Sequence, residues 1–518
     1  MPDYEKEELG TDLNPGILIS DHTIAKVASR QSAQSKRIGA KKEAVESQVD
    51  IDKMDNGDSS SLSSGNGLEP TPTAGNELEV TPTSDKIIVS FSDDDPENPY
   101  TWSMTKKMFV LFVSICCVMN STVSSGLASN SASFYGREFG VTSNALLILP
   151  TSLFLLGYVI GPVFYGPMSE QYGRKYVSVF AFIFFAIWTM ASALAPNLAA
   201  LVVFRFLCGI GAACPIVVVG GTCADIFKSP ASRGRGMAIF MGATTFGPCA
   251  GPVISGYISP ALNWRWSFWV GLIFAGATMV PLLLVPETYG PVLLKRRAQK
   301  MRKESGNDKI VAPIELEKED WRHVVSKVLT RPIRMFIFEP LVLFSCLYLS
   351  FVYGVFYMLF QAYPKVYVNI YGFSLGQEGL TFISIGVGAC FAIPMYLWWD
   401  SITKKARAQN KEWVQQEEMR RLPLACAGGP FFMVSCFWLG WSARESVHWA
   451  VPVCSGIFFG VGYLLIFMAL LNYLVDAYKI FAASAMAAAS ASRSLFGCVL
   501  PFAARPSKFE NMPHLVTA

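Results

Sequence analysis

The chain has 518 residues, of which 52% are hydrophobic and only 16% charged, with a formal net charge of +4. Soluble domains contain about a quarter charged residues, so this composition excludes an ordinary soluble protein; no basic cluster accompanies a nucleic-acid-binding motif, so we expect no nucleic-acid partner. All 12 cysteines lie in apolar runs, which argues against a secreted disulfide framework, and no Cys/His spacing indicates a metal site.

The first part of the chain, residues 1–104, is polar, nearly free of aromatic residues and low in complexity, as in SSSLSSGNG. Because it contains too few apolar residues to form a core, we expect a disordered tail. The sequence MPDYEKEELGTDLN has no apolar centre and therefore does not resemble a signal peptide.

From residue 106 onward the chain becomes a series of apolar runs of about twenty residues, the length that spans a bilayer as a helix. The runs predict an all-α polytopic membrane protein with spans at 108–127, 145–165, 176–195, 198–222, 237–258, 267–285, 340–360, 379–399, 423–441, 450–471 and 482–503. The long polar segment 286–339 divides them into an N-terminal six-helix bundle, 105–285, and a C-terminal bundle of five helices, 340–504.

The distribution of Lys and Arg predicts the orientation of the chain. If the N-terminal tail is cytoplasmic, most basic residues outside the spans share its side, and the opposite loops contain only Arg137, Arg265, Lys365 and Arg444. Cytoplasmic loops carry the excess of basic residues, so we expect a cytoplasmic N-terminus. We expect a monomer in the plasma membrane, with the vacuolar membrane as the alternative location.

The segment GPMSEQYGRK, 166–175, places charges between two apolar spans. Any short cytoplasmic loop needs turn residues and some positive charge, which accounts for Arg174 and Lys175 but not for the whole pattern with Gly166, Glu170 and Gly173. The segment resembles the loop signature of the major facilitator superfamily, although Glu170 stands where that family usually has Asp.

Two further segments carry the same resemblance. VVFRFLCGIGAA, 202–213, resembles the membrane arginine motif, and GATTFGPCAGPVISG, 242–256, resembles the antiporter signature. NWRWSFWV, VPETYGP, EPLVLF and NYLVDAY look like the fungal drug:proton antiporter branch. The resemblance covers about residues 98–504 and implies two pseudo-symmetric helical bundles that export a small amphipathic compound, such as a drug, toxin or fungal secondary metabolite. It implies a proton gradient as the energy source, no cofactor and no enzymatic activity.

The motifs suggest roles for particular charges. Arg174 and Asp225 are a candidate gating pair, with a solvated loop charge as the alternative interpretation of Arg174. An arginine inside a span is expensive, so Arg205 is a candidate for proton coupling or substrate binding. The alternative is a structural arginine bonded to backbone carbonyls. No carboxylate lies in the middle of a predicted span, so the sequence does not reveal the proton site.

The antiporter segment is rich in residues that shape helices. Its glycines permit close helix packing, and its prolines remove backbone donors and kink the helix. The resemblance implies that this segment flexes or seals the interface through Gly242, Gly247, Pro248, Gly251, Pro252 and Gly256. Tyr353, Tyr357 and Gln361 are candidates to line a substrate path because they combine apolar bodies with polar tips; ordinary packing is the alternative for each.

The end of the sequence raises alternatives. The family would continue with a twelfth helix, whereas RPSKFENMPHLVTA, 505–518, is too polar to cross a bilayer. This divergent tail suggests an error in the coding sequence or a true truncation. If the truncation is real, a membrane protein that does not transport is an alternative function. A polyamine exporter is another alternative, although the scarcity of acidic residues in the spans argues against a cationic substrate.

Overall fold

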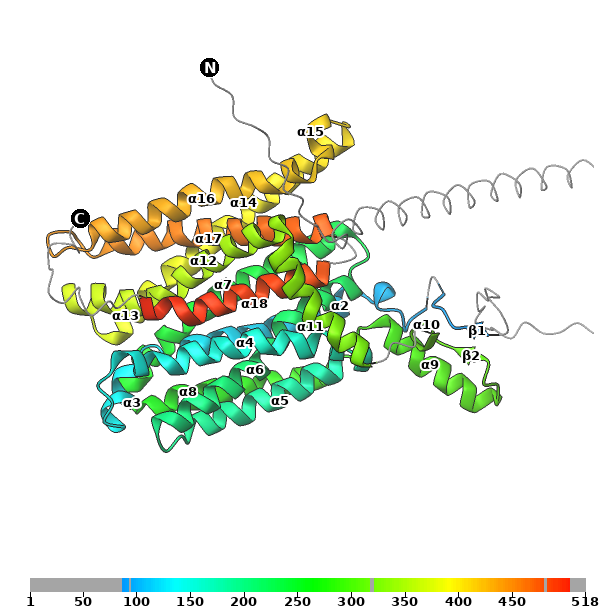
Figure 1. Cartoon of the computed structure of the whole chain (residues 1–518), viewed down its shortest axis with the longest axis horizontal. Helices are drawn as coiled ribbons and strands as arrows, with labels where there is room; N and C mark the ends of the chain where they lie inside the picture. Colours follow the sequence, from blue (N-terminus) through cyan, green and yellow to red (C-terminus); the bar gives the residue numbers. More distant parts are fainter. Residues whose placement is uncertain (1–85, 93–94, 317–320, 479–481, 504–518) are drawn as a thin grey trace, which may run out of the picture. The chain divides into compact units, whose positions relative to one another are not determined.

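The computed structural model describes residues 86–92, 95–316, 321–478 and 482–503. In these ranges, 11 helices are long and apolar enough to cross a membrane, and each overlaps one of the predicted spans, so the prediction of 11 apolar helices is confirmed. The helices form two bundles that lie side by side (Figure 1).

The elements follow one another along the chain in three groups. The first bundle contains α2 (Met104–Gly126), α3 (Ala132–Glu138), α4 (Asn144–Tyr172), α5 (Arg174–Ala193), α6 (Leu198–Ile226), α7 (Pro230–Ala261) and α8 (Trp264–Leu284). The central segment contains α9 (Gly290–Ser305), β2 (Ile310–Val311), α10 (Pro313–Leu316) and α11 (Trp321–Phe338). The second bundle contains α12 (Pro340–Tyr363), η2 (Pro364–Ile370), α13 (Leu375–Thr381), α14 (Ile383–Ala408), α15 (Glu412–Gln415), α16 (Glu417–Ser442), α17 (Ala450–Tyr478) and α18 (Ala482–Ala503).

Polar side chains at the turns fix where several helices begin. The Asn197 side chain accepts a hydrogen bond from the backbone N–H of Ala200 at 2.8 Å at the start of α6. Ser374 and Gln377 form a capping box at the start of α13. These caps satisfy backbone N–H groups that have no partner inside the first helical turn.

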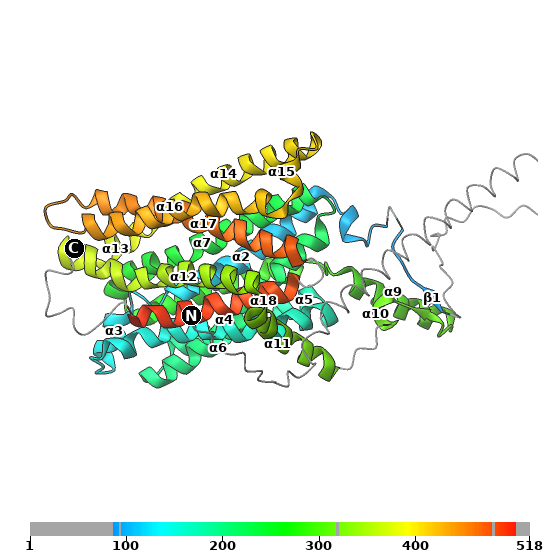
Figure 2. The same cartoon turned by 45° about the horizontal axis from the view of Figure 1, so that its top comes forward.

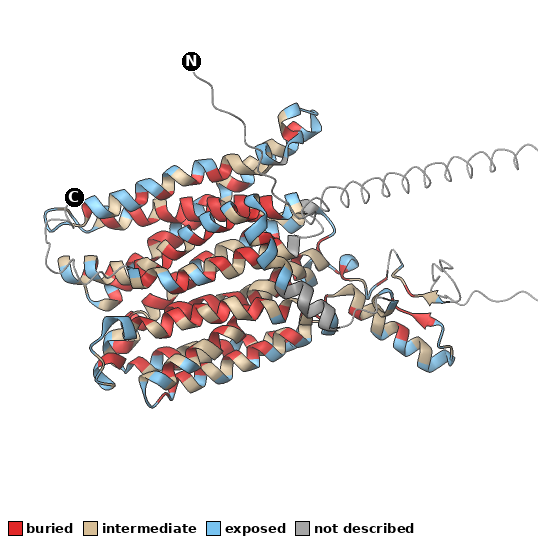
Figure 3. Ribbon diagram, viewed as in Figure 1, coloured by how far each residue is buried: buried red, intermediate tan, exposed pale blue. Residues whose placement is uncertain are grey.

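Burial distinguishes central helices from peripheral ones (Figure 3). In the most apolar window of α17, 78% of the residues are buried, compared with 28% in α8 and in α16. The second bundle is therefore built around α17. The exposed apolar side chains of the peripheral helices form the surface that the hydrocarbon of a bilayer covers, and they include Ile273, Leu284, Phe437 and Trp441.

The two ends of the bundles differ in their neighbours. The short helices α3 and α13 lie at one end, and α9, α10 and α15 lie at the other (Figures 1 and 2). We call these the α3 end and the α9 end. Basic residues gather at the α9 end, since α9 alone carries Lys295, Arg296, Arg297, Lys300, Arg302 and Lys303.

The segments outside the spans are more structured than the sequence indicates. Residues 86–92 and 95–104 belong to the tail predicted as disordered, yet β1 (Ile87–Ile88) pairs in parallel with β2 and η1 (Pro99–Thr101) leads into α2. The apolar run of Ile87 to Val89 supplies the burial that the tail otherwise lacks, and Val89 is fully buried. The central segment, predicted as a polar loop, contains helices. Residues 1–85 and 505–518 lie outside the described residues.

An ion pair holds the approach to the first span against the central segment. Asp95 is 6% exposed, and its carboxylate pairs with the guanidinium of Arg297 on α9. The same carboxylate accepts a hydrogen bond from the backbone N–H of Glu97 at 2.9 Å. A buried carboxylate without its partner is costly, so this pair fixes the approach.

We predict that Asp95→Ala releases β1 from β2. The loss of a charge-assisted hydrogen bond at a buried site costs about 1–3 kcal/mol, which is enough to expose the backbone bond from Ile87 N to Lys309 O. Amide hydrogen exchange at Ile87 and Val89 measures the effect. Glu97→Ala is the matched control, because Glu97 lies 4.0 Å from the same arginine but is 62% exposed. Equal exchange in both variants would contradict the role of Asp95.

Candidate functional site

The GPMSEQYGRK segment joins α4 to α5 through Gly173, which has a φ of 98°. A Cβ at this position would collide with the carboxylate of Glu287. That carboxylate accepts a hydrogen bond from the backbone N–H of Arg174 at 2.8 Å. Glycine is therefore required here for two reasons, the positive φ and the close approach of a neighbouring side chain.

The Arg174 side chain joins several helices at the α9 end. Its Nε donates to Asp225 Oδ2 at 3.2 Å, so the structure brings the predicted pair together. Its Nη1 donates to Ser169 Oγ at 2.6 Å, and the guanidinium lies 4.8 Å from the ring centre of Tyr289. Ser169 and Asp225 both belong to the first bundle. In this conformation the arginine ties the ends of α4, α5 and α6 together rather than latching one bundle to the other.

Glu287 is a part of this network that sequence reasoning missed. It is 5% exposed and also accepts hydrogen bonds from the backbone N–H groups of Lys175, Thr288 and Tyr289 at 3.0–3.2 Å. The acid stands in VPETYGP directly after the sixth span, and that position is the only signal in the sequence. Because backbone donors satisfy the carboxylate, it clamps the start of α5 to the end of α8.

The remaining residues of the loop have lesser contacts. Glu170 is exposed, and among the described residues it forms no hydrogen bond or ion pair. A Cβ at Gly166 would meet only Val217, at 3.9 Å, which is an ordinary contact. In this conformation the acid that anchors the network is Glu287, rather than the acid of the loop itself.

Arg205 is fully buried in the middle of the first bundle. Its guanidinium donates to Ser124 Oγ at 3.1 Å, to Ser124 O at 2.6 Å and to Pro150 O at 3.3 Å. It also lies 4.2 Å from the ring centre of Phe154 and 5.5 Å from that of Phe268. The side chain thus connects α6 to α2 and α4 through uncharged partners, which leaves its positive charge without a carboxylate.

Two separate pairs of hydroxyl groups lie along α2, and the second pair crosses from the first bundle to the second. Ser121 Oγ lies 2.6 Å from Tyr158 Oη, which joins α2 to α4. One helical turn further along α2, Ser125 Oγ lies 2.9 Å from Tyr357 Oη of α12. Tyr357, a predicted path residue, is 1% exposed. The bundles therefore touch through a buried polar contact near the C-terminal end of α2, and we call this contact the centre.

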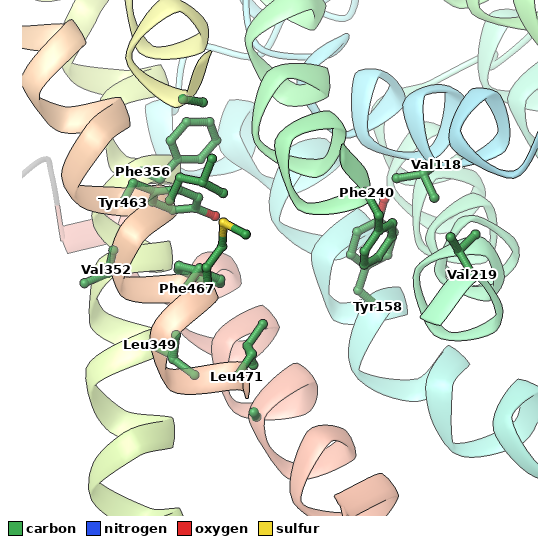
Figure 4. Close-up of a cluster of buried hydrophobic side chains, with 14 of the residues drawn as sticks. Val118, Tyr158, Val219, Phe240, Leu349, Val352, Phe356, Tyr463, Phe467 and Leu471 are labelled. Carbon is green, nitrogen blue, oxygen red and sulfur yellow. The ribbon is translucent and has the colours of Figure 1, made fainter. Parts of the chain in front are cut away.

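Buried aromatic side chains occur in both bundles (Figure 4). Figure 4 shows Phe356, Tyr463 and Phe467 of the second bundle in one group and Tyr158 and Phe240 of the first in another. Such rings give an apolar wall that also carries polar tips.

Tyr353, a predicted path residue, and Arg493, an arginine that sequence reasoning missed, border the aromatic wall. The ring of Tyr353 lies 5.0 Å from that of Tyr357. Gln361 is partly exposed and forms no hydrogen bond among the described residues. Arg493 of α18 lies 5.6 Å from the ring centre of Tyr353, and its buried Nε has no partner. A lone arginine in ASASRSLFG was a signal that sequence reasoning did not use.

Helix α7 carries the antiporter segment without interruption, although Pro248 and Pro252 lie inside it. A Cβ at Gly251 would lie 2.6 Å from the backbone of Gly126 on α2, so the two helices approach too closely for a larger residue. A Cβ at Gly247 would collide with Thr122 on the same helix. Gly242 faces the second bundle instead, where its Cβ would meet Ile393 at 3.0 Å.

The same helix joins the bundles at the α3 end. A Cβ at Gly256 would collide with the backbone carbonyl of Leu375 at the start of α13. Asn130 Nδ2 lies 3.2 Å from Pro252 O, 3.3 Å from Leu375 O and 2.5 Å from Glu378 Oε2. Sequence reasoning left Glu378 just outside the predicted span 379–399, but the structure buries it completely.

The cavities near these residues are small. One of about 30 Å³ adjoins Arg174 and Lys175 in the first bundle, and one of about 20 Å³ lies between Met241, Tyr396 and Met486. Sites for organic ligands usually measure about 300–1,000 Å³, so neither cavity accommodates such a ligand in this conformation. Among the described residues, no group of His, Cys, Asp and Glu is arranged to hold a metal ion.

We predict that Gly173→Ala destabilises the protein more than Gly140→Ala. Both glycines have positive φ, 98° and 66°, and such backbone positions cost a residue with a Cβ about 1–3 kcal/mol. A Cβ at Gly140 has open space, whereas one at Gly173 displaces Glu287 from its backbone donors. Thermal unfolding in detergent compares the two variants, and an equal shift in Tm would show that Glu287 makes no stabilising contact here.

Comparisons with known proteins agree with this arrangement. Residues 111–501 match the family model described as Major Facilitator Superfamily. The efflux pump FUBT of Fusarium oxysporum is 37% identical over 421 residues, which cover 80% of this chain and 70% of that protein. The MFS-type transporter penM of Penicillium rubens is 34% identical over 412 residues, which cover 79% of this chain and 80% of that protein.

Solved structures share the fold at low sequence identity. The xylose transporter XylE of E. coli, in a partially occluded inward-open conformation, matches with a TM-score of 0.54 and 18% identity over 77% of this chain and 91% of that chain. The human organic anion transporter MFSD10 matches with a TM-score of 0.51 and 15% identity, covering 77% of this chain and 92% of that chain. From its helices, its motifs and these matches, the chain belongs to the Major Facilitator Superfamily.

Proposed function

We propose that this protein exports small amphipathic organic compounds, such as drugs, toxins or fungal secondary metabolites, in exchange for protons. The names of its relatives, an efflux pump and an MFS-type transporter of fungi, support export. The observation that carries the proposal is the centre between the bundles, where aromatic rings, hydroxyl groups and a guanidinium gather around the contact of Ser125 with Tyr357.

The chemistry of this centre favours an amphipathic substrate. The rings of Tyr353, Phe467 and Tyr463 offer a flat apolar surface, since Tyr463 and Phe467 stack with ring centres 4.5 Å apart. Arg493 lies over Tyr353 and Phe467 with a donor that has no partner in the described structure. A ligand with an apolar body and an acceptor group satisfies both features.

The charges argue against a polycation as the substrate. Arg205 and Arg493 place two positive charges near the centre, and the hydrogen bonds of Arg205 go to Pro150 O, Ser124 Oγ and Ser124 O, which are all uncharged. Like charges in a medium of low dielectric constant repel strongly. A polyamine exporter is therefore a weaker proposal than an exporter of neutral or acidic amphipathic compounds.

The basic residues of α9 support a cytoplasmic α9 end and hence a cytoplasmic N-terminus. The α3 end then faces outward. We place the protein in the plasma membrane, where a proton gradient directed inward supplies the energy; the vacuolar membrane is the alternative. Transport follows by rocking of the two bundles about the centre, which exposes it at one end and then at the other.

Dye efflux from yeast cells that lack their own exporters tests the proposal. Cells that express the full chain and are loaded with a fluorescent amphipathic rhodamine dye should lose the dye faster than cells with an empty vector. A protonophore should abolish the difference, because it collapses the proton gradient. An exporter that works equally well with the protonophore would contradict proton exchange, and efflux equal to the empty vector across a panel of amphipathic dyes would contradict export.

We predict that Arg205→Ala lowers the rate of dye efflux at least about tenfold while the protein still reaches the membrane. The substitution removes three hydrogen bonds that join α6 to α2 and α4 and removes the positive charge, and each bond to a charged group is worth about 1.5–3 kcal/mol. Arg205→Lys should fail as well, since an ammonium cannot reproduce the fork of a guanidinium.

The matched control is Arg235→Ala. Arg235 is exposed on α7, where its guanidinium donates a long hydrogen bond of 3.4 Å to Ser232 Oγ. Efflux by this variant should equal that of the unsubstituted protein. Normal efflux by Arg205→Ala, with equal amounts of protein at the membrane, would limit Arg205 to a packing role.

A further inference from the structure

The contact between the bundles at the α3 end contains a carboxyl group with one unsatisfied oxygen. Glu378 lies on α13 and is 0% exposed. Its Oε2 accepts a hydrogen bond from Asn130 Nδ2 at 2.5 Å, whereas its buried Oε1 has no partner. Asn130 belongs to the first bundle and Glu378 to the second, so this hydrogen bond crosses the interface.

The groups around Glu378 do not supply a positive charge. Tyr363 of α12 and Tyr367 of η2 are the phenols close enough to interact with it electrostatically, and Tyr367 Oη is itself buried without a partner. Tyr257 of α7 packs against Gly376, which belongs to α13 like Glu378. Lys365 of η2 is exposed. Among the described residues, no Lys, Arg or His forms an ion pair with Glu378.

This environment tolerates one protonation state better than the other. A carboxylate that is completely buried and keeps one oxygen without a donor pays a large desolvation cost. The neutral acid avoids that cost and still accepts the hydrogen bond from Asn130. The closed contact therefore matches the protonated side chain.

The contact is also too tight to admit water while it stays closed. A Cβ at Gly379 would lie 2.6 Å from Pro252 O, and a Cβ at Gly256 would collide with Leu375 O. The backbones of α7 and α13 thus touch directly beside Glu378. Because Glu378 is 0% exposed in the closed contact, we expect water to reach its carboxyl group when the two helices separate.

We propose that Glu378 is a proton-controlled gate at the α3 end: the protonated side chain holds α13 against α7 and Asn130, and its ionisation opens this contact. When the contact is open, water carries a proton to the carboxylate, and the neutral acid can be buried again. When the acid loses its proton to water, the carboxylate requires hydration and keeps the helices apart. The equilibrium between closed and open states then depends on pH because the two states bind the proton with different affinity.

This gate rests on the proposed function only for the direction of transport. If the α3 end faces outward, external acid closes the gate after the substrate has left, which gives the proton gradient a role in resetting the exporter. The gate itself can be measured in the absence of substrate, so its test does not depend on whether export occurs.

The test measures the opening of the α3 end directly. Spin labels are placed on Thr142→Cys, before α4, and Asn369→Cys, in η2, which are exposed positions in the first and second bundles. The 12 native cysteines are replaced. Distance distributions from electron–electron resonance in lipid nanodiscs, without substrate, should shift from short to long as the pH rises. In Glu378→Gln, which mimics the neutral acid, the short distance should persist at every pH.

Two further variants keep the result interpretable. Glu445→Gln removes an exposed carboxyl group from the second bundle, in the turn before α17, and should titrate like the parent. Asn130→Ala removes the donor that favours the closed contact, so the midpoint should move to lower pH by about one unit for a tenfold weaker closure. This variant also serves where Glu378→Gln does not fold.

Three results would overturn the gate: a parent protein whose distances ignore pH, a Glu378→Gln variant that titrates like the parent, or an Asn130→Ala variant with an unchanged midpoint. The outcomes for the gate and for the proposed function are separable. A pH-dependent distance lost in Glu378→Gln, with no dye efflux from cells, supports the gate and rejects export. Dye efflux that needs the proton gradient, with distances unaffected by Glu378→Gln, supports export and rejects the gate.

Discussion

The burial of charged groups among apolar helices is the constraint on which this structure depends. The hydrocarbon of a bilayer provides no water to hydrate a charge, so each charged side chain must lie at an end of the bundles or find polar partners inside them. Arg205 meets the constraint with two backbone carbonyls and a hydroxyl group, and Glu287 meets it with backbone N–H groups. Glu378 meets it only in part, because Oε2 accepts a hydrogen bond from Asn130 while Oε1 has no partner. The stability of its closed contact therefore depends on whether the carboxyl group is protonated.

Much of the fold was predictable because hydropathy responds to the same constraint. Among the described residues, each of the 11 helices that could cross a membrane overlaps an apolar run found in the sequence. The ends were less predictable, since β1 depends on pairing with β2, more than two hundred positions away in the printed sequence. Glu378 was missed for a related reason. It falls one residue outside the apolar run, and it is buried by α7 and Asn130, which are distant from it in the sequence.

The candidate site shows the same division between local and distant information. The pairing of Arg174 with Asp225 could be anticipated, because both residues lie at the same end of neighbouring spans. The need for Gly173 could not be fully anticipated from the sequence. The carboxylate of Glu287 fills the space that a Cβ at Gly173 would need, and Glu287 is separated from Arg174 by 113 positions. Arg493 differs from both, since a lone arginine within an apolar run was visible in the sequence and was not weighed.

The two ends of the molecule are built on different principles, and this difference bears on how it moves. At the α9 end, Arg174 and Glu287 join helices of one bundle, so the network can travel with that bundle as a rigid body. At the α3 end, Asn130 and Glu378 join the two bundles, so any opening there must break their hydrogen bond. Rocking of rigid bundles must therefore break this hydrogen bond and the contact of Ser125 with Tyr357, together with the packing of α4 against α18 and of α7 against α14. A carboxyl group at the first of these contacts lets a proton alter the energetic cost of opening without changing the packing of either bundle.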